Sequence, residues 1–417
     1  MHVSLAKYKE TFHFSVNFYS LFLLFTFIPD IIHTDSVTFK YAFWGIKLLL
    51  ACWVIFNLKK GNKRFFSGLE NLFILLFFIY AADIYIDVFL HPLPALAKTN
   101  GLMDFIGFCL ILAIALSFRY DPAFHSEKSF RFFLITLTVG LVIAYFMATQ
   151  NLTLDVGNIR YDANSNVNSI NYGQMGCALA IVSIFGITAY QKKMQKLFFL
   201  ITLLVGLLSI AKAGSRSPLV VLALVTFFFF VARMGFIKAL FITLVSAVLF
   251  IVFLHSIEAL LNSLGSSLTA RVESAVNDNE SSGRNDIWSN ALNIIKSSPI
   301  TGKYYIIPYG EGVGGYPHNF FLEVFMATGL LGGIPFVALI FIGLYRSFRL
   351  LKAQHPSSWI VLLFLQMIVF GSFSTGLYSS QDLWALLFFV CSINMYNLKE
   401  SKKILIEQRG NSSHVFA

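Results

Sequence analysis

The stretch LVTFFFFVA, residues 224–232, contains no charged side chain and lies inside a longer apolar segment. A helix needs about 20 predominantly apolar residues to cross the ~30 Å hydrocarbon layer of a membrane. Of the 417 residues of the chain, 57% are hydrophobic and 12% are charged, and the mean hydropathy is +0.72. This composition is typical of integral membrane proteins and leaves no room for a separate soluble domain. The sequence therefore predicts an all-α membrane protein with one polytopic domain over residues 1–417.

Twelve apolar segments are candidate transmembrane helices. They cover residues 14–32, 39–57, 70–90, 101–118, 130–149, 170–190, 195–210, 217–232, 237–255, 318–344, 358–375 and 382–397, of which 195–210 has the weakest pattern. With the N-terminus in the cytoplasm, the inner segments carry 21 Lys and Arg residues and the outer segments carry nine. Because Lys and Arg accumulate in cytoplasmic loops, this bias predicts that both termini are cytoplasmic.

One predicted outer loop, residues 255–317, is far longer than the others. Long ordered loops in compact chains usually carry function. Within it, SSGRNDIWSNALNIIKSSP (281–299) combines serines suited to capping, apolar residues at helical spacing and a terminal proline. This pattern predicts an amphipathic helix on the membrane surface or over a cavity, with Trp288 as an interfacial anchor. Residues 398–417 are predicted to form a cytoplasmic tail.

The formal charge of +10 would suggest a nucleic-acid partner for a soluble protein. Here most positive residues lie in predicted cytoplasmic segments of a chain that contacts the bilayer, so we expect no nucleic acid. The long outer loop has a formal charge of −2, so an anion bound there would need particular arginines, whose planar guanidinium suits phosphate. No phosphate-binding glycine loop or metal-ligand motif is found, and we expect neither a metal nor a cofactor.

The segment AKAGSRSP, residues 211–218, joins two predicted spans at the outer face and contains Lys212 and Arg216. One interpretation is that both side chains extend to the membrane interface. The other is a diphosphate site, in which the Gly-Ser turn, exposed helix-end amides and Arg216 hold a lipid-linked leaving group. Two basic residues in one tight outer turn run against the positive-inside bias, and this favours the diphosphate site, with Lys212 in support.

Arg284 opens the predicted amphipathic helix. Two interpretations are equally open: a weak local ion pair with Glu280 or Asp286, or contact with a substrate. Arg160 and Arg271 have the same local interpretation and a weaker claim to function.

The segment GEGVGGYPHN, residues 310–319, leads into the tenth predicted span. A histidine at a helix entrance is more often a cap or interfacial residue than a base. Here the glycines permit close backbone approach to a ligand. Asn319 and Glu323 are four residues apart, so we expect them to share a helix face and a hydrogen bond. His318 is a candidate general base, with Asn319 and Glu323 as supports.

Further ionisable residues lie in or beside the predicted spans. Asp83 and Asp87 share a face of the third span, and Lys47 on the second is a candidate partner. Whether these three groups are structural or functional stays open. Asp382 opens the last span at the outer surface, where it could orient a base or an arginine.

Three segments in order carry a resemblance to a known family: GSRSPLVV (214–221), GRNDIWSNALNIIKSSPITG (283–302) and PHNFFLEVFMATGLLGG (317–333). They resemble the signature segments of the O-antigen ligase and polymerase superfamily. The likeness covers mainly residues 205–345, and the third segment is the most specific. It implies a multi-pass enzyme of the bacterial inner membrane with its active site facing the periplasm.

By this resemblance, the enzyme is an inverting, metal-independent glycosyltransferase whose donor is a glycan linked to undecaprenyl diphosphate. Arg216 and Arg284 would bind the donor diphosphate, and His318 would activate the acceptor hydroxyl. A ligase passes the glycan to the lipid A core, whereas a polymerase passes it to a growing polysaccharide, and the sequence does not distinguish the two. A chain-length regulator or other assembly proteins are compatible partners.

The main alternative is a flippase or secondary transporter for lipid-linked sugars, which also fits twelve spans. Transporters tend to place broken helices and charges near the membrane midplane in related halves of the chain. Here the polar candidates gather at the outer face beside one large loop. This distribution favours chemistry at the surface over transport, and the absence of a carboxylate pair at glycosidase-like positions disfavours hydrolysis.

Overall fold

The computed structural model describes residues 66–90, 101–120, 127–150, 160–163, 167–253 and 284–393, with isolated positions at 45, 48, 49, 52, 93, 256, 259, 268 and 395. The described part is helical, apart from β1 (Thr149–Gln150) and β2 (Tyr161–Asp162), which pair antiparallel. Its α-helices are α3 (Gly68–Tyr85), α4 (Gly101–Ser117), α5 (Glu127–Met147), α6 (Ser169–Ala189), α7 (Lys193–Ala213), α8 (Ser217–Met234), α9 (Phe236–Val252), α12 (Arg284–Ser297), α13 (Phe320–Lys352), α14 (Ser358–Gly371) and α15 (Gln381–Ser392). A π-helical turn, η1 (Ile86–Leu90), continues α3.

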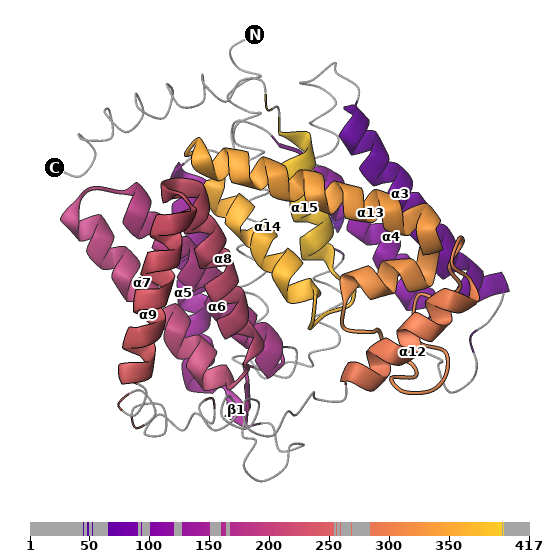
Figure 1. Ribbon diagram of the computed structural model, residues 1–417, viewed down its shortest axis with the longest axis horizontal. Coiled ribbons are helices and arrows are strands. Elements are labelled where there is room, and N and C mark those ends of the chain that lie inside the picture. Colours follow the sequence, from indigo (N-terminus) through magenta and orange to yellow (C-terminus); the bar gives the residue numbers. More distant parts are fainter. Residues whose placement is uncertain are drawn as a thin grey trace.

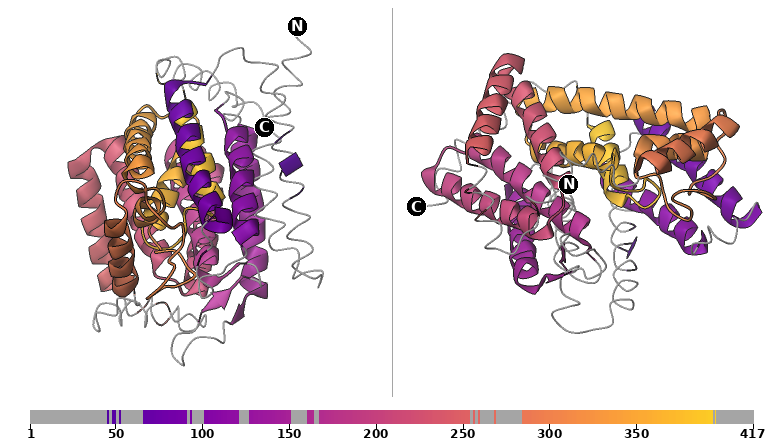
Figure 2. Two further views of the ribbon diagram at one scale, coloured as in Figure 1. Left: turned by 90° about the vertical axis from the view of Figure 1, so that its right-hand side faces the viewer. Right: turned by 60° about the horizontal axis from the view of Figure 1, so that its bottom comes forward.

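The helices form two groups that α13, α14 and α15 connect (Figure 1). Helices α5 to α9 make one group, and α3, α4 and α12 belong to the other. Helix α13 contacts α3 and α12 as well as α8, and α14 contacts both α6 and α8. The ladder of β1 and β2 and helix α12 lie at the same end of the molecule in two views (Figures 1 and 2). We call this the α12 end.

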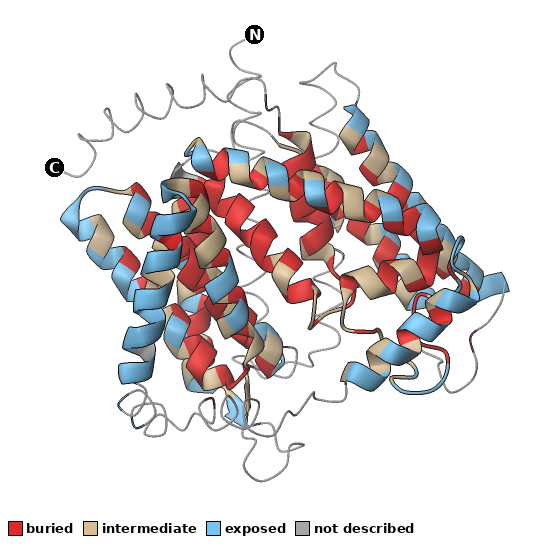
Figure 3. Cartoon of the chain, in the orientation of Figure 1, coloured by how far each residue is buried: buried red, intermediate tan, exposed pale blue. Residues whose placement is uncertain are grey.

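Burial follows this arrangement, because α14 and α15 are buried along most of their length (Figure 3). Apolar helices that are buried all round occupy the centre of a bundle. Outer helices such as α9 expose large apolar side chains, including Ile237, which is 82% exposed. Apolar side chains on the outside suit contact with lipid.

Six helices of the described part are long and apolar enough to cross a membrane. They agree with the predicted spans at 70–90, 130–149, 170–190, 195–210, 217–232 and 318–344. The weakest prediction, 195–210, is thus a helical span candidate, α7. Helices α4, α9, α14 and α15 coincide with four further predictions but are shorter apolar helices. The predictions at 14–32 and 39–57 lie outside the described residues.

Helix α13 is interrupted near its start, at Gly329, whose φ of 57° and ψ of −147° are compatible essentially with glycine alone. The break leaves main-chain groups that the preceding loop satisfies: Lys303 N donates to Met326 O at 2.9 Å, and Leu330 N donates to Pro299 O at 2.9 Å. The first turns of α13 are therefore locked to the loop that follows α12.

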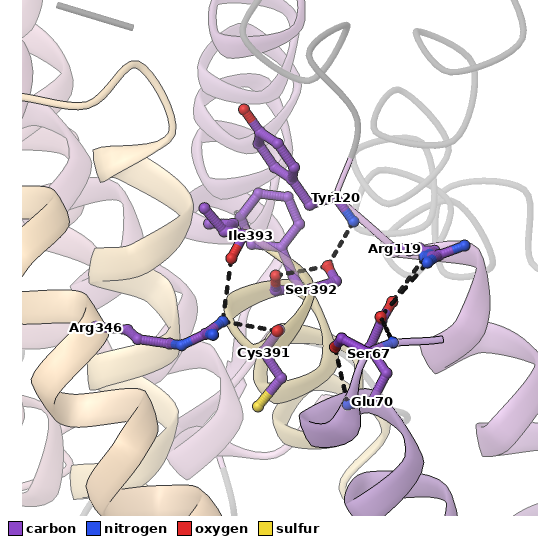
Figure 4. Close-up of polar contacts among 9 residues, drawn as sticks. Ser67, Glu70, Arg119, Tyr120, Arg346, Cys391, Ser392 and Ile393 are labelled. Atoms are coloured by element: carbon purple, nitrogen blue, oxygen red, sulfur yellow. Dashed lines mark hydrogen bonds and ion pairs between the residues drawn. The ribbon is translucent and has the colours of Figure 1, made fainter. Parts of the chain in front are cut away.

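Polar contacts tie the start of α3 to the ends of α4 and α15 (Figure 4). Ser67 and Glu70 form a capping box at α3. Glu70, which is 2% exposed, also accepts a hydrogen bond from Arg119 Nε at 2.6 Å. Arg346 of α13 donates to main-chain oxygens that the end of α15 leaves open, including Cys391 O at 2.7 Å. These contacts hold the start of α3 against the end of α4, and α13 against the end of α15.

Candidate active site

A fully buried carboxylate ties α13 to the loop of residues 372–380, which we call the α14–α15 loop. Glu323 is 0% exposed. It accepts hydrogen bonds from Tyr80 Oη at 2.8 Å and from the main-chain nitrogens of Leu377 and Tyr378 at 2.7 and 2.8 Å. Because a buried carboxylate without such donors is costly, these contacts constrain all three segments strongly.

Asn319 joins the same two segments, but not in the predicted way. Its Oδ1 accepts from the main-chain nitrogens of Phe321 and Leu322 at 2.9 and 3.1 Å, as the N-cap of α13. Its Nδ2 donates to Ser372 O at 2.9 Å. The predicted side-chain bond between Asn319 and Glu323 is wrong, because Asn319 precedes the helix and its amide oxygen caps the first turn.

His318 lies in the turn before α13 with a φ of 55°, an uncommon value for a residue with a side chain. Trp288 Nε1 donates to the main-chain oxygen of Pro317 at 2.8 Å. The ring of Tyr316 meets the imidazole edge-on, with ring centres 4.6 Å apart. The main chain of Ser374 in the α14–α15 loop also lies near enough to act on the pKa of the imidazole, which it raises. The contacts of Trp288 and Tyr316 therefore hold this turn and the imidazole in place.

Three arginines from distant parts of the chain influence one another, and one of them, Arg284, also influences His318. Burial, followed by the charge of Arg216, lowers the pKa of Arg284. Burial, then Arg216 and more weakly Arg284, lower the pKa of Arg160, and Asp162 partly opposes them. Burial and then the charge of Arg284 lower the pKa of His318 below its ordinary value. We call Arg160, Arg216 and Arg284 the arginine cluster, and it places concentrated positive charge beside a neutral imidazole.

The local ion pair offered for Arg284 is not formed with Asp286. Arg119 and Glu70, in contrast, do form an ion pair, with Nε and Oε1 2.6 Å apart. The alternative partner, Glu280, lies outside the described ranges. The buried Nε of Arg160 also has no hydrogen-bond partner in the part of the chain that the structure describes. Like charges gathered in one place make a favourable site for an anion.

Lys212 has a separate environment from Arg216, although both lie at the same turn. Its Nζ is 3.9 Å from the ring centre of Tyr161 and 5.7 Å from that of Tyr145, as in cation–π contacts. Gly214, with a φ of 63°, ends α7 in the left-handed conformation. Arg216 then precedes α8 on the other side of this turn. A supporting role for Lys212 at the diphosphate stays a prediction.

The glycine-rich segment before His318 packs on α12. Gly310 and Gly312 have φ values of 75° and 83°, and a Cβ at Gly310 would meet Asn290 Nδ2 at 2.9 Å. Asn290 Nδ2 donates to the main-chain oxygens of Tyr309 and Glu311 at 2.7 and 3.0 Å. Gly310 and Gly312 therefore allow close approach of α12, and close approach of the segment to a ligand stays a prediction.

Helix α12 itself agrees with the prediction from 281–299, but it packs against α13. Its buried residues Ala291 and Ile294 contact Met326 and Ile307 in a small apolar cluster. The indole of Trp288 holds the main chain next to His318, and its role as an anchor at the membrane interface stays a prediction. Helix α12 thereby carries Arg284 to the site.

The remaining predicted carboxylates divide between the site and its supports. Asp382 lines a cavity of about 530 Å³ together with His318. Asp87, 2% exposed, accepts a hydrogen bond from Tyr305 N at 3.0 Å and so holds the chain before His318. Asp83 Oδ2 is buried without a hydrogen-bond partner among the described residues. Lys47 lies outside them, so its pairing with the aspartates stays a prediction.

Sequence reasoning gave Arg160 too little weight and did not name Tyr80, Tyr316 or Ser374. For Arg160 a signal exists, because a basic residue in a predicted outer segment runs against the positive-inside bias. The other three carry no local signal, since an apolar helix and a serine-rich turn contain many such residues. Their roles follow from contacts between segments far apart in sequence.

Residues 200–337 match the family model described as O-antigen ligase. The matched range contains Arg216, Arg284 and His318, whereas Arg160 precedes it. A comparison with curated protein sequences gave no match. The chain is therefore a multi-pass membrane protein whose residues 200–337 are similar to the O-antigen ligase family.

Proposed function

We propose that the chain transfers a glycan from undecaprenyl diphosphate to an acceptor hydroxyl at the α12 end, on the periplasmic side of a bacterial inner membrane. The observation that carries the proposal is the arginine cluster beside His318. Guanidinium groups bind phosphate oxygens through paired, charge-assisted hydrogen bonds. An imidazole held next to the bound phosphate is positioned as a general base must be.

In the proposed reaction, His318 accepts the proton of the acceptor hydroxyl while that oxygen attacks the anomeric carbon of the donor sugar. The bond between the anomeric carbon and the diphosphate oxygen breaks, and the electron pair leaves with undecaprenyl diphosphate. Attack opposite the leaving group inverts the anomeric configuration. Negative charge develops on the departing oxygen, where the arginine cluster stabilises it without reorganisation.

The charges of the site favour this order of events. Without a donor, burial and Arg284 lower the pKa of His318, so its imidazole is neutral near pH 7 and able to accept a proton. Protonation beside the arginine cluster would be unfavourable alone, but the bound diphosphate supplies compensating negative charge. Donor binding therefore strengthens the base that uses it.

The fixed charges of the arginine cluster supply what a divalent cation would supply to a leaving diphosphate, and we propose a metal-independent reaction on that ground. Both termini are placed in the cytoplasm by the proposed topology. Two acceptors remain: the lipid A core for a ligase, or a growing polysaccharide for a polymerase. Proteins that regulate chain length would be partners of the polymerase.

Deletion of the gene tests the function and separates the two enzyme types. Gel analysis of surface and lipid-linked glycan is expected to show loss of transferred glycan, with its lipid-linked donor accumulating. Long lipid-linked polymer without attachment indicates a ligase, and single attached repeats indicate a polymerase. A flippase would instead leave its lipid-linked sugar on the cytoplasmic leaflet, and protection of the accumulated donor from periplasmic enzymes would contradict our proposal.

A further inference from the structure

The cavity of about 530 Å³ extends from His318 into the bundle. Its walls come from α5, α6, α14, the α14–α15 loop and the start of α15. Near His318 they carry small polar groups, among them Ser374, Thr375 and Ser380. Further walls are apolar, with Phe133 and Met367. Polar groups beside apolar surface suit a sugar ring, which has hydroxyls at its edge and C–H groups on its faces.

The charge of the lining is unlike that of the arginine cluster. No lysine or arginine is among the described residues that line the cavity, and Asp382 contributes a carboxylate. His318 adds no full positive charge in its neutral form. The described lining therefore offers an anionic sugar a carboxylate and no lysine or arginine.

Two buried amides in the wall have incomplete hydrogen bonding. Gln174 of α6 is 6% exposed, and Gln366 of α14 is 3% exposed. Gln366 Nε2 donates to Gln174 O at 2.8 Å and to Gln174 Oε1 at 3.2 Å. Because a main-chain carbonyl can only accept, this contact fixes which end of the Gln366 amide faces α6. Gln366 Oε1 and Gln174 Nε2 are left buried without a partner in the described structure.

Such a pair is unusual, since buried polar groups are nearly always hydrogen-bonded and an unmade bond costs folding free energy. One acceptor and one donor on neighbouring side chains match a neutral group that can both donate and accept. A hydroxyl or an acetamido group of a sugar has this property. Both glutamines belong to the lining of the cavity.

We propose that this cavity binds an uncharged acceptor sugar, with Gln174 and Gln366 recognising one of its hydroxyl or acetamido groups beside His318. The identification of the bound sugar as the acceptor rests on the proposed transfer reaction. It narrows that reaction to acceptors whose reacting sugar and its neighbour in the cavity lack phosphate and carboxylate groups. The donor diphosphate stays at the arginine cluster.

The test is ligand-detected NMR on the purified full chain in nanodiscs, with methyl glycosides of glucose, galactose, N-acetylglucosamine and glucuronic acid as probes. At least one neutral glycoside is expected to bind, and the glucuronide is expected to bind at least about tenfold more weakly than that neutral probe. Equal or tighter binding of the glucuronide, or binding of no neutral probe, would overturn the proposal. The experiment measures binding and requires no transfer. Its result therefore does not depend on whether the chain has the proposed enzyme activity, and the two proposals can fail separately.

The variant Gln174→Leu/Gln366→Leu provides the second arm. Sugar binding is expected to weaken about tenfold, as for the loss of one or two neutral hydrogen bonds, while the melting temperature stays equal or rises. The matched control is Ser183→Ala/Thr202→Val, a buried pair on α6 and α7 whose hydroxyls do bond each other at 2.8 Å. The control should melt earlier but bind sugar normally. A glutamine variant that melts earlier and binds sugar as the wild type does would assign the amides to structure alone.

Discussion

Replacing His318 by alanine is expected to lower the rate of glycan transfer by about 10²- to 10⁴-fold, the range for loss of a positioned general base. The φ of 55° and the ring contact with Tyr316 hold the imidazole in one place. Alanine removes the proton acceptor and leaves the arginine cluster intact. Initial rates of transfer by purified protein measure the effect.

Binding of undecaprenyl diphosphate is the internal control for this variant. It should remain close to that of the wild type, because the diphosphate is bound by arginines rather than by the imidazole. A variant that has lost both transfer and donor binding would have lost its fold or its donor site. Transfer at the wild-type rate would show that another group accepts the proton.

The pH dependence of the wild type gives an independent measure of the same residue. Only neutral His318 can accept a proton, so activity is lost as the pH falls through its pKa. In the free enzyme this pKa lies below the ordinary value of 6.5, and kcat/KM for the donor should fall only at correspondingly acid pH. The bound diphosphate should raise the pKa, so kcat should fall at a higher pH than kcat/KM. Coincident profiles would contradict the coupling between donor and base.

Replacing Arg284 by alanine should lower transfer by about 10²- to 10³-fold, as expected for one preorganised group that stabilises a developing negative charge. Arg160→Ala should act in the same direction although Arg160 lies outside the family match. Lysine should restore only part of the activity at either position, because it lacks the paired donors of arginine. The measurements are transfer rate and donor affinity.

Arg349→Ala is a matched control for the arginine variants. Arg349 is an exposed residue in the last turn of α13, where its Nη1 donates to Tyr345 Oη at 2.8 Å, and its loss should leave transfer unchanged. In our account, Arg160 and Arg284 bind the same diphosphate. The double alanine variant should therefore lower the transfer rate by less than the product of the two fold-reductions measured for the single variants. Wild-type transfer by Arg284→Ala would remove this residue from the donor site.

Features that depend on local pattern were predictable from the sequence. Apolar composition indicated the span candidates, and spacing with caps indicated α12, which begins at Arg284 as expected from SSGRNDIW. The order of three short segments indicated the family, which the match over residues 200–337 confirms. Such signals lie within a few helical turns of chain.

Features that depend on packing were not predictable in this way. The spacing of Asn319 and Glu323 suggested a shared helix face, but α13 begins at Phe320, so Asn319 became a cap. Arg160 acquires its place because the chain around β2 lies beside the α7–α8 turn, where Lys212 contacts Tyr161. One sequence without its tertiary contacts gives no measure of these distances.

The central claim is that this chain itself transfers glycan from a lipid diphosphate. The most direct test is to reconstitute the purified chain in liposomes with isotope-labelled, lipid-linked glycan and the lipid A core acceptor, both extracted from cells that lack the gene, and to follow both products by mass spectrometry. We expect undecaprenyl diphosphate to be released in equal amount to the glycan transferred, with wild-type protein but not with His318→Ala. Labelled donor that crosses the bilayer unchanged, with no undecaprenyl diphosphate released, would contradict the account.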